Sequence, residues 1–233
     1  MISVVVPAYN EAAHIGALLD SLTRQTTRRR FEVIVVDNAS TDETAAVARR
    51  WADRLRLRVI AEPVRSRGAA RAAGFAAAKG AIILSTDTDT TVPPQWVERL
   101  ATAVEQPGVV AVTGTCRIED CAPRTNRGFN LLQPWAMRVY RLVYGHYWLT
   151  GSNSALQRVA YERSGGYSAD AVDLDDIELG FRLQHEGRIR MVSDVPVTTS
   201  GRRFRRGLLR GLWPYAAVFF RRFWFGQASA SRD

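Results

Sequence analysis

Short runs of β-branched residues alternate with helix-like segments through the first half of the chain. Strand-like runs cover Ile2–Val6, Phe31–Val36, Arg58–Ala61 and Ala81–Ser85. In the segment Glu11–Arg24 between the first two runs, apolar residues recur every three or four positions, as in an amphipathic helix. Continuous β-branched strands joined by helices are typical of a parallel sheet covered on both faces. The alternation therefore predicts an α/β fold with a mainly parallel central sheet flanked by helices.

The rest of the chain continues both periodicities. Helices are predicted over Thr44–Leu55, Gly68–Lys79, Gln95–Glu105 and Leu179–Glu186, and strands over Val109–Thr113 and Ile189–Val192. Arg117–Arg127 is polar and rich in turn residues, which predicts a mobile loop. Phe129–Val143 predicts a helix, or a kinked pair around Pro134, because proline disrupts a helix interior. Its aromatic residues suit core packing better than contact with an acceptor or a membrane.

Polar residues follow the ends of three predicted strands. Pro7–Glu11 follows the first strand, Asp37 ends the second and Asp87–Asp89 follows the fourth. In a parallel sheet the ligand crevice lies outside the carboxyl ends of the strands. We therefore expect these residues to meet along one edge of the sheet.

Asp87 and Asp89 form an Asp-x-Asp pattern directly after an apolar run. A turn beginning at Thr88 would let both carboxylates converge above the strand end. Two hard oxygen ligands at such a point suit Mg²⁺ or Mn²⁺, and a divalent ion suits a diphosphate. The pattern is short and common, so a polar loop that happens to hold two aspartates is the alternative.

The residues after the first strand exclude one nucleotide-binding class. A dinucleotide site of the Rossmann type needs Gly-x-Gly-x-x-Gly at this position. Here the chain reads Pro7-Ala8-Tyr9-Asn10-Glu11, without a glycine. A nicotinamide-dependent enzyme is therefore disfavoured, although Asp37 at the end of the second strand remains well placed for a ribose hydroxyl or a base N–H.

The charge balance is strongly basic, at +9, and Lys79 is the only lysine that contributes to it. Such a protein attracts the phosphates of nucleotides, nucleic acids or anionic lipids. No nucleic-acid motif accompanies the arginines, so nucleic acid is not expected as a partner. Cys116 and Cys121 are too few for a disulfide framework, and no histidine-rich set accompanies them to suggest zinc.

Targeting signals are not visible in the sequence. The N-terminus lacks a basic segment followed by a long apolar stretch, which disfavours a signal peptide. No run of about 18 apolar residues predicts a membrane-spanning helix. We therefore expect a cytoplasmic protein, held peripherally at the inner face of the membrane if its tail binds lipid.

The composition changes after residue 200, which divides the chain into a domain over 1–200 and a basic, aromatic tail over 201–233. Arginines precede and follow the aromatic and apolar stretch Leu212–Phe220, and Phe223-Trp224-Phe225 comes directly after Arg221-Arg222. This pattern predicts an amphipathic C-terminal helix in the headgroup region of an anionic bilayer. The alternative is a helix packed on its own domain, or on a second subunit to form a homodimer.

Five motifs, in this order, carry a family resemblance: Val4–Glu11, Val35–Asp42, Arg67–Gly74, Thr86–Asp89 and Asp175-Asp176. Together they resemble the family 2 glycosyltransferases over roughly residues 2–190. The resemblance implies a nucleotide-diphospho-sugar transferase fold, called GT-A. It also implies an enzyme that moves a hexose from a nucleotide-diphospho-sugar to an acceptor hydroxyl and inverts the anomeric configuration.

The resemblance also assigns the donor side of the site. It implies that the nucleoside is held by Pro7, Tyr9, Glu11 and Asp37, with Tyr9 against the base. Arg67 and Arg71 would lie near the nucleotide. Asp87 would reach the ribose or the metal, and Asp89 would bind Mg²⁺ or Mn²⁺ directly.

On the acceptor side, the resemblance makes Asp176 the general base. Asp175 stands where the family usually has glutamate, and its shorter side chain could change contacts with the acceptor. The aromatic, basic tail makes a lipid-linked acceptor plausible. Some relatives add a late histidine to the metal, but no histidine follows His185. Arg202 or Arg203 in the comparable region is instead expected to close over the diphosphate.

Two other functions remain open from the sequence. A nucleotidyltransferase of similar fold is disfavoured because no glycine-rich loop with a lysine follows the first strand. Non-catalytic binding of membranes or nucleic acids would explain Arg28-Arg29-Arg30 and the basic tail. It would not account for the five motifs.

Overall fold

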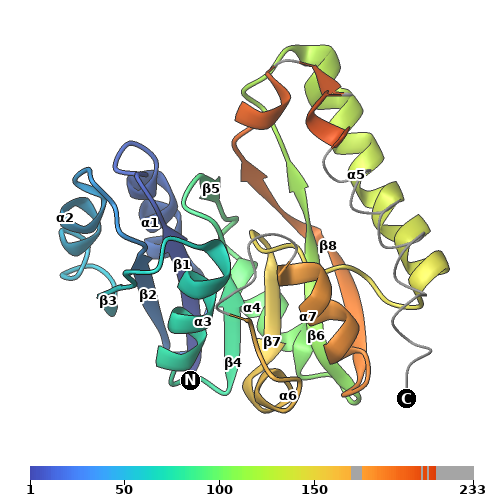
Figure 1. The fold of residues 1–233 in the computed structure, drawn as a ribbon, viewed down its shortest axis with the longest axis horizontal. Coiled ribbons are helices and arrows are strands. Elements are labelled where there is room, and N and C mark those ends of the chain that lie inside the picture. Colours follow the sequence, from blue (N-terminus) through green and yellow to red (C-terminus); the bar gives the residue numbers. More distant parts are fainter. Residues whose placement is uncertain (169–174, 206, 209, 214–233) are drawn as a thin grey trace.

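The computed structural model describes residues 1–168, 175–205, 207–208 and 210–213 (Figure 1). Its described residues form one eight-stranded sheet in the order β3-β2-β1-β4-β7-β6-β8-β5. The strands are β1 (Ile2–Ala8), β2 (Phe31–Asp37), β3 (Leu57–Ala61), β4 (Ile82–Ser85), β5 (Thr90–Thr91), β6 (Val109–Arg117), β7 (Ser154–Gln157) and β8 (Arg188–Thr199). The predicted α/β fold is confirmed.

The N-terminal half is a parallel unit. β3, β2, β1 and β4 pair in parallel, and the first three crossovers run through α1 (Ile15–Thr23), α2 (Thr44–Arg49) and α3 (Arg67–Ala77). The register places Ala8 beside Asp37, so the ends of β1 and β2 lie together. In the other half, β7 is antiparallel to both β4 and β6, whereas β6 and β8 are parallel.

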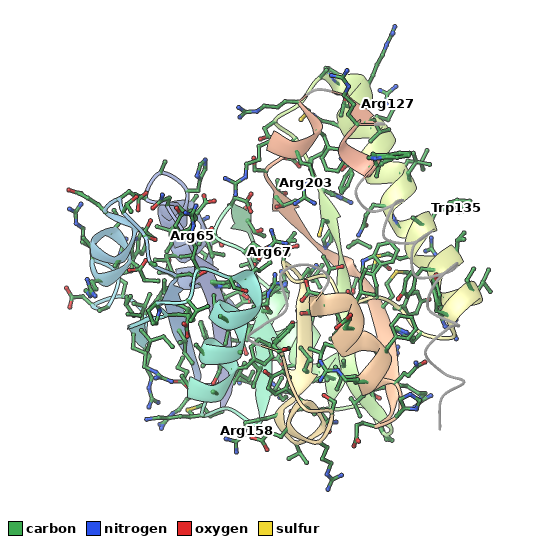
Figure 2. All side chains as sticks on the ribbon, in the orientation of Figure 1. Arg65, Arg67, Arg127, Trp135, Arg158 and Arg203 are labelled. Atoms are coloured by element: carbon green, nitrogen blue, oxygen red, sulfur yellow. The ribbon has the colours of Figure 1, made fainter. Side chains whose placement is uncertain are left out.

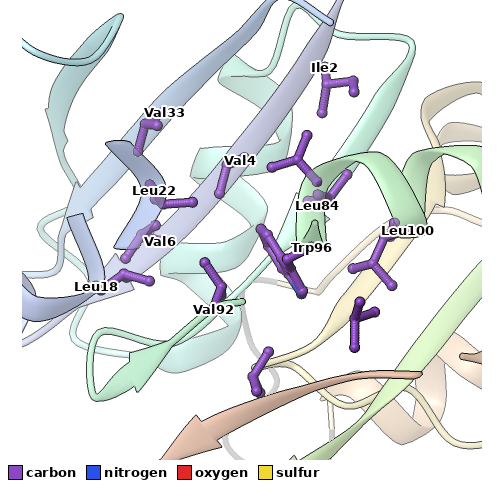
Figure 3. Close-up of a cluster of buried hydrophobic side chains, with 14 of the residues drawn as sticks. Ile2, Val4, Val6, Leu18, Leu22, Val33, Leu84, Val92, Trp96 and Leu100 are labelled. Carbon is purple, nitrogen blue, oxygen red and sulfur yellow. The ribbon is translucent and has the colours of Figure 1, made fainter. Parts of the chain in front are cut away.

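Helices cover both faces of the sheet. Alternating side chains of β1 enter opposite cores, with Val4 and Val6 on one face and Val5 on the other. The first face is covered by α1 and α4 (Trp96–Val104), which contribute Leu18, Leu22, Trp96 and Leu100 to the cluster in Figure 3. The second face is covered by α3, α6 (Arg158–Arg163) and α7 (Asp175–Leu183). This coverage explains why the N-terminal strands are apolar on both sides.

The longest helix, α5 (Pro123–Tyr144), corrects one prediction and decides between the two alternatives of another. It begins inside the segment that was expected to be a loop, because Pro123 suits the first helical turn. Asparagine side chains then fasten this turn, since Asn126 and Asn130 accept hydrogen bonds from the backbone N–H groups of Cys121 (3.2 Å) and Ile118 (2.9 Å). The helix also continues through Pro134 as one element.

Other boundaries differ from expectation as well. α2 ends at Arg49 instead of Leu55, and β8 continues to Thr199 instead of stopping at Val192. The extension of β8 is stabilised by pairing with β6 and, at its end, with β5. β7 and α6 were not predicted, because neither short segment has a clear periodicity. Cys116 and Cys121 are free thiols.

The start of the predicted tail packs against the domain. Residues Arg202–Phe204 form a single 3₁₀ turn, and the buried Phe204 ring lies 4.8 Å from that of Phe129 on α5. Residues 214–233, which hold most of the predicted amphipathic helix and its dimer contact, lie outside the described residues. Within the described part of the chain, no helix combines the length and apolar composition needed to cross a bilayer.

Candidate active site

The turn between β4 and β5 carries the two motif aspartates at the carboxyl edge of the sheet. The carbonyl of Asp87 accepts a hydrogen bond from the backbone N–H of Thr90 (3.2 Å), which closes the turn. The carbonyl of Asp89 accepts one from the N–H of Ser200 (3.0 Å), just after β8. The turn therefore brings Asp87 and Asp89 to one end of the sheet, but each carboxylate meets a different arginine.

Asp89 belongs to an acidic cluster with Glu11. Its side chain is only 12% exposed, and Nη2 of Arg202 lies 2.9 Å from its carboxylate. The same nitrogen lies 2.6 Å from Oε1 of Glu11. Burial raises the pKa of the Asp89 carboxyl, Arg202 opposes the rise, and the charges of Asp87 and Glu11 add to it. The ionised cluster therefore lacks full charge compensation.

Arg71 joins the two parts of the candidate site that hold Asp87 and Asp176. It lies on α3 with 1% of its side chain exposed, and Nη2 is 3.1 Å from Oδ1 of Asp87. Nη1 is 3.0 Å from Oδ2 of Asp176, which is 105 residues away in the sequence. Gly151 makes room for this pair, because a Cβ there would lie 2.7 Å from Oδ2 of Asp176.

Asp176 lies in the first turn of α7 and has a second partner. The Tyr167 hydroxyl donates a hydrogen bond to Oδ1 of Asp176 (2.8 Å), and its ring packs edge-on against Phe75, 5.1 Å between centroids. Sequence reasoning missed Tyr167 and Gly151 as site residues. The only signal was a Gly-Gly-Tyr turn a few residues before the acidic helix start. Asp175 begins α7, and its side chain lies outside what the structure describes.

At the carboxyl ends of β1 and β2, two loops are joined by hydrogen bonds. Asn10, at a φ of 52°, accepts a hydrogen bond from the backbone N–H of Thr41 (2.8 Å). The N–H of Glu11 donates to Thr44 (2.8 Å). Close hydrogen bonds between the β1–α1 and β2–α2 loops fix the neighbouring residues Tyr9 and Asp37 beside each other at the sheet edge.

Arginines lie near the Tyr9 loop. The Arg65 guanidinium lies 4.1 Å from the centre of the Tyr9 ring, a contact that sequence reasoning missed. Figure 2 shows Arg65 and Arg67 on the N-terminal half of the molecule, and Arg203 on the neighbouring part that follows β8. Arg67 is exposed at the start of α3, and Pro7 lies within β1 opposite Val36. Of the two arginines expected near the diphosphate, Arg202 contacts the acidic cluster and Arg203 is exposed.

The donor set fits a hard divalent ion that shares its coordination with a phosphate ligand. Asp87 and Asp89 supply two carboxylates, and no group of three or more metal-ligating side chains gathers among the described residues. Mg²⁺ sites at phosphate substrates typically use one or two carboxylates, with phosphate and water completing the shell. A cation would also offset the charge repulsion that raises the pKa of Asp89. Cys116 is no candidate, because burial raises the pKa of its thiol to about 12.

Residues 3–165 match the profile of the family described as Glycosyl transferase family 2. A validoxylamine A glucosyltransferase from Streptomyces hygroscopicus subsp. jinggangensis is 31% identical over 86% of this chain and 53% of its own. An undecaprenyl-phosphate 4-deoxy-4-formamido-L-arabinose transferase from Edwardsiella ictaluri is 35% identical over 45% of this chain and 34% of its own. The chain spans about half the length, or less, of these curated relatives.

A solved structure shares the fold. It is the mannosyltransferase PcManGT from Pyrobaculum calidifontis in complex with GDP-Man and Mn²⁺. The TM-score is 0.70 at 28% sequence identity, and the match covers 93% of this chain and 64% of that one. The fold described above is thus shared with a protein whose structure was solved with GDP-Man and Mn²⁺.

Proposed function

The chain belongs to glycosyl transferase family 2, and from this premise we propose that it transfers a sugar from a nucleotide-diphospho-sugar to an acceptor hydroxyl with inversion. The observation that carries the proposal is Arg71, which is buried between Asp87 on the donor side and Asp176 on the acceptor side. One cation thus holds the two parts of the site in a fixed relation. Such a link is useful only if both carboxylates act on the same reaction.

We infer that the donor lies along the carboxyl edge of the parallel half. Tyr9 would pack against the base, and Asp37 would accept from the base or ribose, with Pro7 and Glu11 shaping the pocket. Arg67, exposed at the start of α3, is in a position to meet the nucleotide. Asp87 would contact the ribose or the metal. Packing of Arg65 on Tyr9 supports this arrangement, because it shows that the aromatic face accepts a planar group.

The metal expected here is Mg²⁺ or Mn²⁺, held by Asp89 and Asp87. The solved mannosyltransferase is a complex with GDP-Man and Mn²⁺, which supports a divalent ion here. When bound, the ion would supply positive charge that offsets the charge building on the leaving diphosphate. Glu11 would add negative charge near the ion, and Arg202 would add positive charge.

Asp176 is the proposed general base. Tyr167 donates a hydrogen bond to the Asp176 carboxylate, and Arg71 donates another. The carboxylate would take the proton of the acceptor hydroxyl as the hydroxyl oxygen bonds to the anomeric carbon and the nucleoside diphosphate leaves. Tyr167 and Arg71 act as positioning residues, since they fix the carboxylate without touching the reacting atoms. Asp175 would contact the acceptor.

One relative supports a lipid-linked acceptor. The Edwardsiella ictaluri relative is named for undecaprenyl-phosphate, a lipid carrier. We propose residues 1–200 as the catalytic domain and 201–233 as an appended basic tail, with one amendment. Arg202 lies beyond residue 200 but reaches Asp89 and Glu11, so the working site includes the first residues of the tail.

The test is nucleotide release from a panel of UDP-, GDP- and dTDP-sugars with Mn²⁺, with and without hydroxyl acceptors. We expect turnover with at least one donor, and Asp89→Asn should lower it on the order of 10²-fold or more, because several kcal/mol of charge stabilisation is lost. Asp53→Asn, an exposed carboxylate outside the site, is the matched control. No turnover with any donor would overturn the proposal.

The same variant makes a prediction about stability. Folding raises the pKa of Asp89, so its contribution to stability is present below the unfolded pKa and is lost as pH rises through the folded pKa. At neutral pH the ionised carboxylate therefore costs stability, and the uncharged amide introduced by Asp89→Asn should leave the melting temperature equal or higher. Mn²⁺ should no longer raise the melting temperature of this variant. A clear loss of stability in Asp89→Asn would contradict this account.

Arg202 should compete with the metal for the carboxylates. We expect Arg202→Gln to tighten Mn²⁺ binding in the absence of donor by about two- to fivefold, because a half-exposed ion pair contributes only about 1 kcal/mol or less. The same change should weaken donor binding, because the guanidinium would pair with the diphosphate once it leaves Asp89. Calorimetric titration with Mn²⁺ and then with donor measures both effects.

The neighbouring Arg203→Gln is the control for this competition. Arg203 is exposed next to Arg202, and the sequence equally suggested it for the diphosphate. If only Arg203→Gln weakens donor binding, and Arg202→Gln leaves the affinity for Mn²⁺ unchanged, the roles assigned to the two arginines are reversed.

A further inference from the structure

The outward face of α5 carries an unusual exposed apolar stripe. Leu131, Trp135 and Leu142 are 73%, 61% and 83% exposed, and their spacing of four and seven residues places them on one side of the helix. The opposite side is buried through Phe129 and Met137. Figure 2 shows Trp135 directed away from the body of the molecule. The helix thus has two apolar faces, of which only one is used by the core.

Arginines share the exposed stripe. Arg124, Arg127 and Arg138 continue its three- and four-residue spacing, and all three are exposed. The sequence of α5 contains no aspartate or glutamate. A hollow of about 340 Å³ lies at the N-terminal end, lined by Pro123, Arg124, Arg127, Gly128 and Leu131. It combines an apolar floor with two guanidinium groups, a combination that suits a phosphate headgroup with its glycerol and first methylenes.

We propose that this face of α5 docks on an anionic lipid bilayer. An interfacial helix buries leucine and tryptophan at the headgroup boundary while arginines pair with lipid phosphates. The apolar side chains at the headgroup boundary would be Leu131, Trp135 and Leu142. The arginines of the stripe would pair with the lipid phosphates. The surface extends beyond the helix, since Arg210 and Trp213 are also exposed and the adjoining Leu208 packs beside Gly128.

Charge complementarity selects the bilayer over two other occupants. A second copy facing this stripe would bring the arginines of two α5 helices together, with no carboxylate on either helix to pair with them. The chain's own residues 214–233 contain Arg221, Arg222 and Arg232 but only one acidic residue, Asp233. Like charges across a contact cost free energy, whereas anionic headgroups remove that cost. The docking surface is independent of the proposed glycosyl transfer.

The test is sedimentation of the full chain with vesicles of phosphatidylglycerol and phosphatidylcholine, compared with phosphatidylcholine alone. We expect binding to the anionic vesicles that falls steeply with salt. Trp135→Ser with Leu142→Ser should weaken it about tenfold or more, since two buried apolar side chains are lost. Arg124→Gln with Arg127→Gln should weaken it by a similar factor on anionic vesicles only.

The matched controls lie outside α5. Val64→Ser with Val159→Ser removes exposed apolar side chains, and Arg49→Gln with Arg50→Gln removes exposed charge at the end of α2. Both double variants should bind as the unaltered chain does. The proposal is overturned if the α5 variants still bind while Trp224→Ser with Phe225→Ser does not, which assigns binding to the tail. It is also overturned if light scattering shows a dimer that the α5 variants dissociate, or if no vesicle binding occurs.

Discussion

Replacing Asp176 with asparagine is expected to lower the rate of sugar transfer by about 10²–10⁴-fold, the usual contribution of a positioned general base. The amide has nearly the shape of the carboxylate and still accepts the hydrogen bond of Tyr167. Asp87 also remains as a partner for Arg71. The change therefore removes the proton acceptor and leaves its surroundings largely in place.

The measurement separates binding from chemistry. Donor affinity from calorimetry should change by less than about threefold, whereas kcat should carry almost the whole loss. Tyr167→Phe is the companion variant, because it leaves the carboxylate but removes one hydrogen bond. It should lower kcat by a smaller factor and shift the acidic limb of the pH profile upward, since that hydrogen bond favours the ionised form.

A normal rate in Asp176→Asn would assign the base elsewhere. Asp53→Asn is the control for the introduced amide, because Asp53 is exposed and outside the site. The control should transfer sugar at the rate of the unaltered chain.

Replacing Arg71 with methionine is expected to lower the free energy of unfolding by about 3 kcal/mol. Removal of one member of a buried ionic group costs about 3–5 kcal/mol, because its partners keep their charge without compensation. The lower end applies here, since Asp87 is partly exposed to water. For a chain of this size the melting temperature should fall by about 6–12 °C.

The cause of that loss can be identified by a double variant. Arg71→Met with Asp176→Asn should be more stable than Arg71→Met alone, because the uncompensated carboxylate at 176 is then neutral. Arg99→Met, which breaks an exposed ion pair with Asp194, should cost about 1 kcal/mol or less. If the double variant recovers nothing, the loss arises from packing around Arg71 and the ionic account is wrong.

The parallel half of the sheet was predictable because its strands are buried on both faces. Continuous β-branched runs, such as those of β1 and β2, are typical of buried parallel strands. For α5 the sequence left a single helix and a kinked pair open, because Pro134 is a strong local signal against an uninterrupted helix. The packing of Phe129 and Met137 overrides that signal, and packing is a tertiary effect.

In the candidate site, too, some features were predictable from the sequence and others were not. Asp87, Asp89 and Asp176 were identified from motifs, because a local pattern accompanies each of them. The link that Arg71 makes between them was not, since its two partners lie 16 and 105 residues away. Arg65 on Tyr9 was missed for a similar reason, as nothing in the local sequence indicates that a loop arginine covers an aromatic ring.

The pairing of β5 with β8 has a consequence for synthesis of the chain. The four parallel strands lie within residues 2–85, so their contacts can form while later residues are still being translated. β5, which follows the turn that holds Asp87 and Asp89, pairs in the described residues only with Thr198 and Thr199. The loops after β1 and β2 can thus fold early on the ribosome, whereas the turn at Asp89 acquires its final hydrogen bond only when Ser200 has emerged.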